Sequence, residues 1–134
     1  MLIVPMREDL TKFGVEETRT PAAVDAAVAS EGTVLMVINS VCGCAAGKAR
    51  PAIGEALAHT TRPTKAVTVF AGGDDEAVKH LRETHLAAYP PSSPSIALFK
   101  NGKPVYVMPR RDIESSIAPH IAQKLKAAFE EHCN

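Results

Sequence analysis

The 134-residue chain contains no tryptophan, and aromatic residues make up only 4% of it. Its 15 Lys and Arg residues are balanced by 15 Asp and Glu residues, so the formal net charge is zero. Nucleic-acid-binding proteins typically carry a basic stripe, so we expect no nucleic acid among the partners. No apolar run approaches the roughly 20 residues that a membrane-spanning helix needs, so we expect no membrane association either.

Cysteine is also scarce. There are three cysteines, and two of them are separated by a single residue, a set unlike the disulfide framework of a secreted domain. Residues 1–5 are shorter than the apolar segment of a signal peptide, and this start lacks the basic region that such a peptide carries. We therefore expect a cytoplasmic protein, in which closely spaced cysteines indicate catalysis or metal binding.

The composition predicts one folded domain over residues 1–134. Apolar residues make up 46% of the chain, which excludes a disordered protein. Residues 1–30 predict a helical N-terminal extension, and residues 31–134 predict the core. Four runs of apolar and β-branched residues predict strands at 33–39, 65–70, 95–100 and 103–108. Asn101-Gly102 predicts a hairpin turn between the last two strands.

Three further helices separate or follow these strands. The first covers residues 44–60, with Pro51 kinking it or ending its first segment. The second begins at a capping Asp74 or Asp75 and ends near residue 86. The third begins at Asp112 and carries apolar residues at every fourth position: Ile113, Ile117, Ile121, Leu125 and Phe129. The order β-α-β-α-β-β-α resembles the thioredoxin-like core, an α/β fold with a central mixed sheet flanked by helices.

Cys42 and Cys44, separated only by Gly43, follow the strand predicted at 33–39 and open the helix behind it. A helix N-terminus presents free N–H groups and partial positive charge, which stabilise a thiolate. We assign Cys42 as the nucleophile because it lies nearer the helix end, and Cys44 as its redox partner. We expect Gly43 to ease the turn between them. The placement predicts thiol–disulfide chemistry rather than two small buried hydrophobes.

Two basic residues, Lys48 and Arg50, follow the thiols closely. In one interpretation they support the site, because a nearby cation lowers the pKa of a thiol and attracts an acidic thiol compound. In the other they are ordinary solvated charges on the surface of the helix.

The X-Pro bond between Ser93 and Pro94 directly precedes the strand predicted at 95–100. In thioredoxin-like folds the corresponding bond is cis and lies beside the thiols, and cis bonds are largely confined to proline. We therefore expect a cis bond here, with Pro94 against the sulfur of Cys42. The Ser93 carbonyl and the Ser95 N–H would then be free to pair with an extended client protein.

Residues 39–52, NSVCGCAAGKARPA, resemble the signature of the bacilliredoxin family, which consists of small thioredoxin-like proteins with a CGC site. The segments 5–7, 69–72, 91–95 and 129–133 fit the same family. The resemblance implies removal of bacillithiol from S-bacillithiolated proteins, with a weaker disulfide isomerase or reductase activity. It also implies that no cofactor is bound, that bacillithiol is a co-substrate, and that bacillithiolated or disulfide-containing proteins are the clients. Residues 109–112, PRRD, depart from the family, which tends to carry a histidine after Pro-Arg.

Two other functions use the same cysteines. A non-catalytic adaptor would sense redox state or bind a metal through Cys42, Cys44 and Cys133, with His132 or another histidine. A CxC pair with one distant cysteine lacks the paired knuckles of a structural zinc site, so we expect no metal there and a free thiol at Cys133. The third possibility is a general disulfide isomerase.

Overall fold

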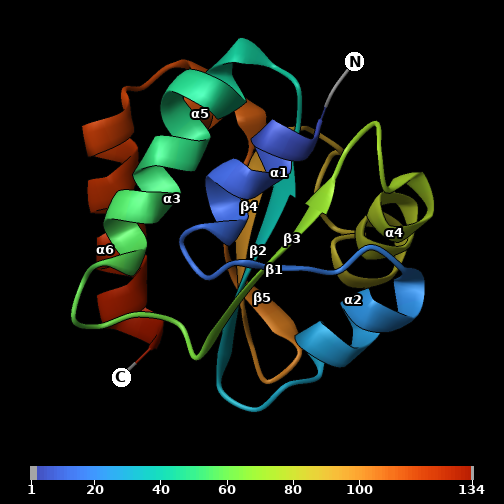
Figure 1. Cartoon of the computed structure of the whole chain (residues 1–134). Helices are drawn as coiled ribbons and strands as arrows, with labels where there is room; N and C mark the ends of the chain where they lie inside the picture. Colours follow the sequence, from blue (N-terminus) through green and yellow to red (C-terminus); the bar gives the residue numbers. More distant parts are fainter. Residues whose placement is uncertain (1–2, 134) are drawn as a thin grey trace.

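The computed structural model describes residues 3–133, which form a five-stranded mixed sheet in the order β1-β3-β2-β4-β5 (Figure 1). The strands are β1 (Glu16–Glu17), β2 (Thr33–Asn39), β3 (Lys65–Phe70), β4 (Ser95–Lys100) and β5 (Lys103–Met108). β3 pairs in parallel with both β1 and β2, whereas β4 is antiparallel to both β2 and β5. The central mixed sheet and the predicted order of the core are thereby confirmed.

All four predicted strands occur within their predicted bounds. The predicted turn between β4 and β5 is present, and both of its residues have positive φ, 54° at Asn101 and 79° at Gly102. The sequence missed β1, because two exposed glutamates show no apolar alternation. Its Glu16 and Glu17 pair with Val67 and Thr68 at the edge of the sheet. The prediction that the N-terminal extension is purely helical is therefore wrong, because this segment also adds a strand to the sheet.

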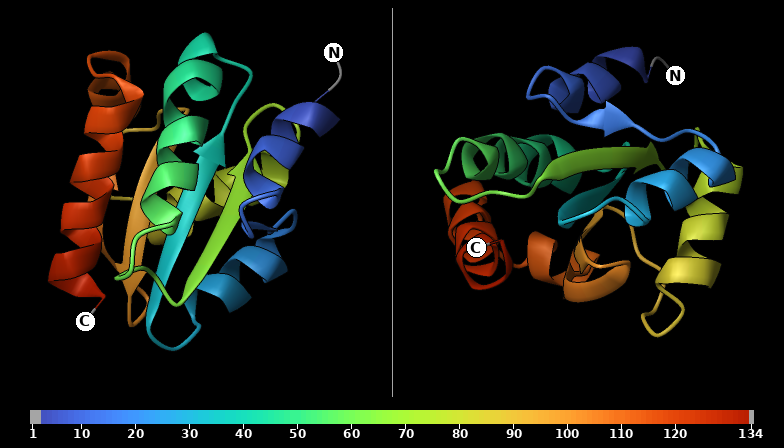
Figure 2. Two further views of the ribbon diagram at one scale, coloured as in Figure 1. Left: turned by 60° about the vertical axis from the view of Figure 1, so that its left-hand side comes forward. Right: turned by 90° about the horizontal axis from the view of Figure 1, so that it is seen from below.

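Helical segments lie on both faces of this sheet, in the layers visible in Figure 2. They are α1 (Val4–Thr11), α2 (Pro21–Val28), η1 (Ala45–Ala49), α3 (Arg50–Leu57), α4 (Asp75–His80), η2 (Leu81–His85), α5 (Arg110–Glu114) and α6 (Ala118–His132), where η denotes a π-helix. One core joins α1, α3, α5 and α6 to one face, around Leu35, Ile53 and Phe129. The other joins α2, α4 and η2 to the opposite face, around Met36, Val78 and Leu81.

The helix predicted from Asp112 is in fact two helices. α5 ends at Glu114, and α6 begins at Ala118 with Pro119 in its first turn. A proline disfavours helical geometry at the preceding residue and cannot donate its N–H, so it suits a helix start and interrupts a continuous one. Ile117, predicted to lie within the last helix as part of its apolar spacing, occupies the N-cap of α6 and is 63% exposed.

Pro51 divides the helix behind the cysteines, as predicted. Upstream of it the chain forms η1, in which the Arg50 N–H donates to the Ala45 carbonyl five residues back. Pro51 has no N–H and lies in the first turn of α3, where none is needed. The wider π turn therefore joins the cysteine loop to the regular helix.

A buried ion pair fastens α1 to the turn between β3 and α4. The Arg7 guanidinium donates two hydrogen bonds to Asp74, of 2.9 and 2.8 Å, and lies 5.2 Å from the centroid of the Phe70 ring. A Cβ on Gly73 would lie only 2.8 Å from Arg7 Nη2, so glycine leaves room for the guanidinium. Asp74 does occupy the N-cap of α4, but its carboxylate does not cap the helix. It accepts from Arg7, Arg19 and the Phe70 N–H instead.

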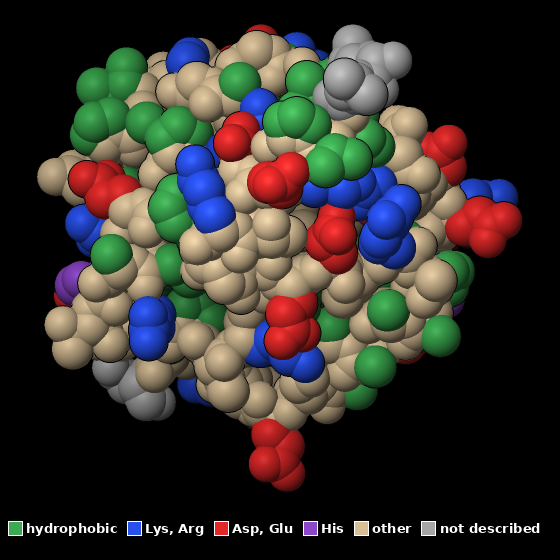
Figure 3. Space-filling view, in the orientation of Figure 1, with side chains coloured by type: hydrophobic (Ala, Val, Ile, Leu, Met, Phe, Trp, Pro, Cys, Tyr) green, Lys and Arg blue, Asp and Glu red, His purple; other side chains and the backbone are tan. Residues whose placement is uncertain are grey.

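The surface carries charges of both signs. Lys, Arg, Asp and Glu side chains are interspersed over the face seen in Figure 3. Among residues 3–133, none of the helices combines the length and the apolar character that are needed to cross a bilayer.

Candidate active site

The two neighbouring cysteines lie where β2 ends and the helical segment begins. Both are free and half-buried, and their sulfur atoms are 2.8 Å apart. The Cys44 N–H also points at the Cys42 sulfur, at 3.4 Å. Cys44 packs against the apolar core that α3 and α6 share. The structure therefore brings together the two thiols that the sequence singled out, and the Cys42 sulfur accepts the contact from the Cys44 N–H.

The surroundings shift the pKa values of the two thiols in opposite directions. The pKa of Cys42 is lowered, first by the hydrogen bond from the Cys44 thiol and then by the Cys44 N–H and the charge of Arg110. The pKa of Cys44 is raised, first by burial and then by its position beside the Cys42 sulfur. When this pair of neighbouring thiols loses its first proton, the thiolate therefore forms on Cys42 and Cys44 keeps its proton. A thiolate is the nucleophilic form of cysteine, so this ordering of the pKa values favours Cys42 over Cys44 as the nucleophile.

Side chains at the end of β2 hold the cysteine loop. The Cys42 N–H donates to Ser40 Oγ at 3.1 Å, and the Ser40 N–H donates to Asn39 Oδ1 at 2.9 Å. Asn39 Nδ2 in turn donates to the Met6 carbonyl in α1 at 3.1 Å. Asn39 and Ser40 are both buried. A chain of hydrogen bonds thus runs from the N-terminal helix to the nucleophile.

Arg110, at the start of α5, is a site residue that the sequence analysis did not single out. It donates through its backbone N–H to Ser92 Oγ at 3.2 Å and through Nη1 to the Ser93 carbonyl at 3.3 Å. Its charge lowers the pKa of Cys42. Through Arg110, residues 109–112, noted for departing from the family pattern, therefore hold the loop before β4 and place a positive charge near the thiols. The sequence carried that signal, but no spacing rule connects Arg110 with Cys42.

The Ser93–Pro94 bond is cis, as predicted, and Pro94 is buried. The Ser93 carbonyl had been expected to be free. It is not, because the guanidinium of Arg110 donates to it. A client strand that pairs with Ser93 would have to displace or share this hydrogen bond. The predicted contact between Pro94 and the Cys42 sulfur stays a prediction.

The two predicted supporting cations have different surroundings. Lys48 lines the same surface depression as Cys42 and Cys44, and its ammonium donates to the Glu114 carbonyl. Arg50 is buried, with its guanidinium 3.4 Å from Asn39 Oδ1 and from Asp9 Oδ2. This placement gives Arg50 a structural role in joining α3 to α1 and β2. A supporting role for either residue in catalysis stays a prediction.

Gly43 has no conformational need to be glycine. Its φ is not positive, and a Cβ at this position would meet no heavy atom within 4 Å. The expectation that glycine eases the turn is therefore wrong, because the turn already has a geometry open to L-residues.

The metal set suggested by the alternative function does not form. Across residues 3–133, one group of three potential ligands comes together, and it contains none of the cysteines. Cys133 follows the last turn of α6 and is a half-buried free thiol.

A mostly apolar cavity borders the loop that Arg110 holds. Its lining combines apolar side chains with two arginines: Ile38, Arg82, Leu86, Tyr89, Val107 and Arg111. Residues 90–92, Ser95 and Pro109 complete the lining, so the cavity borders the cis-proline loop. A surface of this kind could receive apolar side chains of a client and an anionic group beside them.

We expect that Arg110→Gln raises the pKa of Cys42, because it removes the cation that stabilises the thiolate. Alkylation of Cys42 at neutral pH should therefore slow down. The pH dependence of the alkylation rate measures this shift, and Arg111→Gln, which removes the adjacent exposed arginine, is the matched control. An equal pKa in both variants would contradict a role for Arg110.

Comparison with known proteins places these features in a family. The family described as disulphide isomerase matches residues 1–133. A bacilliredoxin from Koribacter versatilis is 51% identical over 134 residues, which cover 99% of this chain and 92% of the relative. A bacilliredoxin from Salinibacter ruber is 54% identical over 135 residues, with 98% and 79% covered. One from Halalkalibacterium halodurans is 50% identical over 133 residues, with 98% and 92% covered.

Solved structures with similar folds include thioredoxins. A thioredoxin from Malassezia sympodialis superimposes with a TM-score of 0.62 at 18% identity, covering 90% of this chain and 91% of that one. A mutant thioredoxin from Halobacterium salinarum has a TM-score of 0.63 at 17% identity, covering 94% and 93%. At such low identity the likeness establishes the thioredoxin fold alone.

Proposed function

This chain belongs to the disulphide isomerase family, whose relatives named above are bacilliredoxins, and we propose that it removes bacillithiol from S-bacillithiolated proteins through Cys42 and Cys44. The family is one of thiol oxidoreductases with the thioredoxin fold. The observation that carries the proposal is the pair of sulfur atoms 2.8 Å apart with oppositely shifted pKa values. The proposed setting is the reducing cytoplasm, where closely spaced thiols stay available for exchange.

The proposed reaction is two successive thiol–disulfide exchanges. The Cys42 thiolate attacks the bacillithiol sulfur of the mixed disulfide, a Cys42–bacillithiol disulfide forms, and the client leaves as a thiolate that takes up a proton. Cys44 then loses its proton and attacks the Cys42 sulfur, so that bacillithiol leaves as a thiolate and a Cys42–Cys44 disulfide remains. Two electrons have passed from the cysteine pair to the mixed disulfide, and an external thiol must reduce the pair before the next turnover.

The raised pKa of Cys44 has a consequence for the second exchange. Cys44 stays protonated while Cys42 is a thiolate, so its thiol can hydrogen-bond to the nucleophile before the reaction. Once the Cys42 sulfur is in a disulfide, the negative charge that helped to raise the Cys44 pKa is gone. Cys44 becomes easier to deprotonate when it is needed as the second nucleophile.

Steady-state release of bacillithiol from a bacillithiolated client, with an excess of a reducing thiol, tests the proposal. Wild-type protein should turn over many equivalents of client, whereas a redox-sensing adaptor would release at most one equivalent. Cys133→Ser is the matched control, because it removes a thiol outside the pair and should leave turnover unchanged.

A general disulfide isomerase is the second candidate, and the family description favours it. It uses the same Cys42 thiolate but acts on disulfides within a misfolded protein. Comparing initial rates on a bacillithiolated client and on a scrambled-disulfide client distinguishes the two. Faster reaction with the scrambled client would make isomerisation the main activity.

A further inference from the structure

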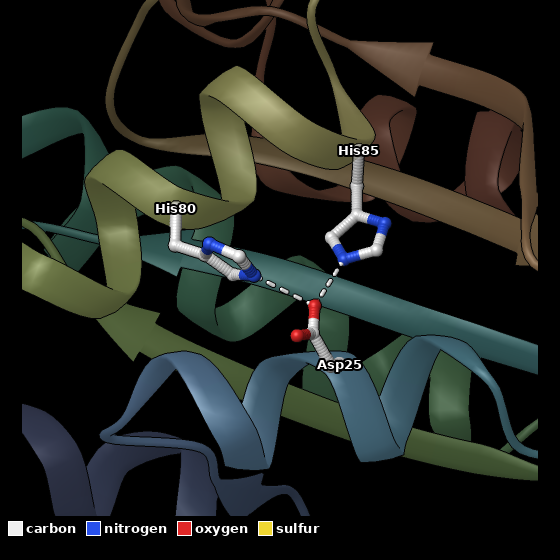
Figure 4. Close-up of side chains that lie close together, drawn as sticks. All are labelled: Asp25, His80 and His85. Carbon is white, nitrogen blue, oxygen red and sulfur yellow. Dashed lines mark hydrogen bonds and ion pairs between the residues drawn. The ribbon is translucent and has the colours of Figure 1, made fainter.

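Three potential metal ligands meet on the face of the sheet opposite to the one that α3 covers. Asp25 comes from α2, His80 from the end of α4 and His85 from the end of η2 (Figure 4). Both imidazole Nε2 atoms lie 2.7 Å from Asp25 Oδ1, and the three ligand atoms are all within 4.8 Å of one another. The cluster has no part in the proposed thiol exchange.

A π-helical turn brings the two histidines to one side. Residues five apart on an α-helix point about 140° away from each other, because each residue advances the helix by about 100°. Here the Leu86 N–H donates to the Leu81 carbonyl, five residues back, at 3.0 Å. The wider turn brings His80 and His85 toward the same side, where α2 packs against α4 and η2 and presents Asp25. Such π turns often occur at functional sites.

Neighbouring groups restrain both rings. Thr84 Oγ1 lies 3.4 Å from Nδ1 of His80, the ring nitrogen that does not face Asp25. The His85 ring meets the Phe99 ring edge-on, with centroids 6.3 Å apart, and the two imidazoles meet edge-on at 5.8 Å. The His80 and His85 side chains are 30% and 17% exposed, whereas that of Asp25 is 51% exposed. The histidines are thus held in place beside a carboxylate that has room to adjust.

We propose that Asp25, His80 and His85 form a binding site for a divalent transition-metal ion of the zinc type. Two imidazole nitrogens and one carboxylate oxygen suit Zn²⁺ and related ions, whereas Mg²⁺ and Ca²⁺ prefer sites made of oxygen atoms. The fourth position of a tetrahedral ion would face solvent and take a water molecule.

Loading such an ion requires small, identifiable changes. Ligand atoms 2.0–2.1 Å from a tetrahedral ion lie about 3.3 Å apart, so the two 2.7 Å contacts must lengthen by rotation of the exposed Asp25. Each histidine must present an unprotonated Nε2 and carry its proton on Nδ1. For His80 that proton can be donated to Thr84 Oγ1, an outer-shell contact of the kind that orients histidine ligands.

Zinc binding is tested on the full chain in which Cys42, Cys44 and Cys133 are all serine, because thiols would otherwise bind the probe. Calorimetric titration with Zn²⁺ alone should show one equivalent bound, and Mg²⁺ should show no binding. In this background His80→Gln, His85→Gln and Asp25→Asn should each weaken Zn²⁺ binding by at least about tenfold. His120→Gln, which removes an exposed histidine from α6, is the matched control and should not change the affinity.

Two further measurements make the zinc titration decisive. Circular dichroism checks that each variant is folded. His80 and Asp25 are exposed enough that their substitution should not unfold the chain. In the nitrogen NMR spectrum of the histidine side chains, the ion should shift the Nε2 resonances of both His80 and His85. The proposal is overturned if the thiol-free chain binds no Zn²⁺. It is also overturned if the three ligand variants bind Zn²⁺ as tightly as His120→Gln, in which case the cluster is only a hydrogen-bonded bridge.

Discussion

Cys44→Ala should accumulate as a mixed disulfide with one bacillithiol on Cys42, whereas Cys42→Ala should carry none and lose all turnover. The first exchange needs one activated thiolate, and the structure provides that thiolate at Cys42. The second exchange needs a neighbouring thiol, and the one within reach of Cys42 is Cys44, at 2.8 Å. Without it the adduct persists until an external thiol attacks. Intact-mass measurement after incubation with a bacillithiolated client shows each species.

The two variants also show which cysteine is the nucleophile and which is the resolving thiol. An adduct on Cys42→Ala and none on Cys44→Ala would reverse the assignment of nucleophile and resolving thiol. No adduct on either would contradict the thiol-exchange function itself. Cys133→Ala is the control for adducts on a thiol outside the pair, and it should give the wild-type result.

Asp74→Asn should lower the free energy of unfolding by about 3 kcal/mol at neutral pH, toward the lower end of the cost of breaking a buried ion pair. The substitution keeps the shape of the side chain but leaves the buried guanidinium of Arg7 without its two-pronged partner. Arg7 retains Glu17 at 2.9 Å, which limits the loss. Urea unfolding measures the change.

Asp75→Asn is the control for this substitution. Asp75 is exposed and lies in the first turn of the same helix, so it interacts mainly with the helix dipole. Its substitution should cost no more than about 0.5 kcal/mol. Equal losses in the two variants would show that the ion pair contributes little.

The same pair predicts how stability depends on pH. The pKa of Asp74 is lowered in the folded state: burial, the largest influence, acts to raise it, but hydrogen bonds from Arg7 and the Phe70 N–H outweigh burial. A carboxyl with a lowered folded pKa stabilises fully above its unfolded pKa of about 3.9 and loses that contribution as pH falls through the folded value. The difference in unfolding free energy between wild type and Asp74→Asn should therefore shrink in acid below about pH 4. A difference that stays constant into acid would contradict this explanation.

The four longer strands and the place of Cys42 could be predicted from the sequence because their signals are local. Each of the four longer strands is a run rich in apolar and β-branched residues, and the cysteine loop directly follows one of them. The cis bond before β4 was also predictable, but only from the order of elements, which pointed to the thioredoxin-like core.

The features that the sequence did not reveal depend on tertiary contacts. β1 consists of two glutamates that are placed by pairing with β3 and by ion pairs with Arg7 and Lys65. Arg110 lies near enough to influence the pKa of Cys42 because α5 packs against η1, and Arg50 turns to α1 because Met6 and Asp9 lie there. The break before α6 was missed because Ile117 continues the four-residue spacing of apolar residues. Pro119 was the contrary signal, because proline suits the first turn of a helix and not its interior.

The central claim is that the fold generates a thiolate selectively at Cys42. The pH dependence of alkylation, with Cys133 replaced by serine and both Cys42 and Cys44 intact, tests it most directly when peptide mapping identifies the modified residue. The structure predicts that Cys42 is modified first, with a midpoint below the pKa of about 8.5 of a free cysteine, while Cys44 stays unmodified. A midpoint at or above that value, or prior modification of Cys44, would contradict the claim.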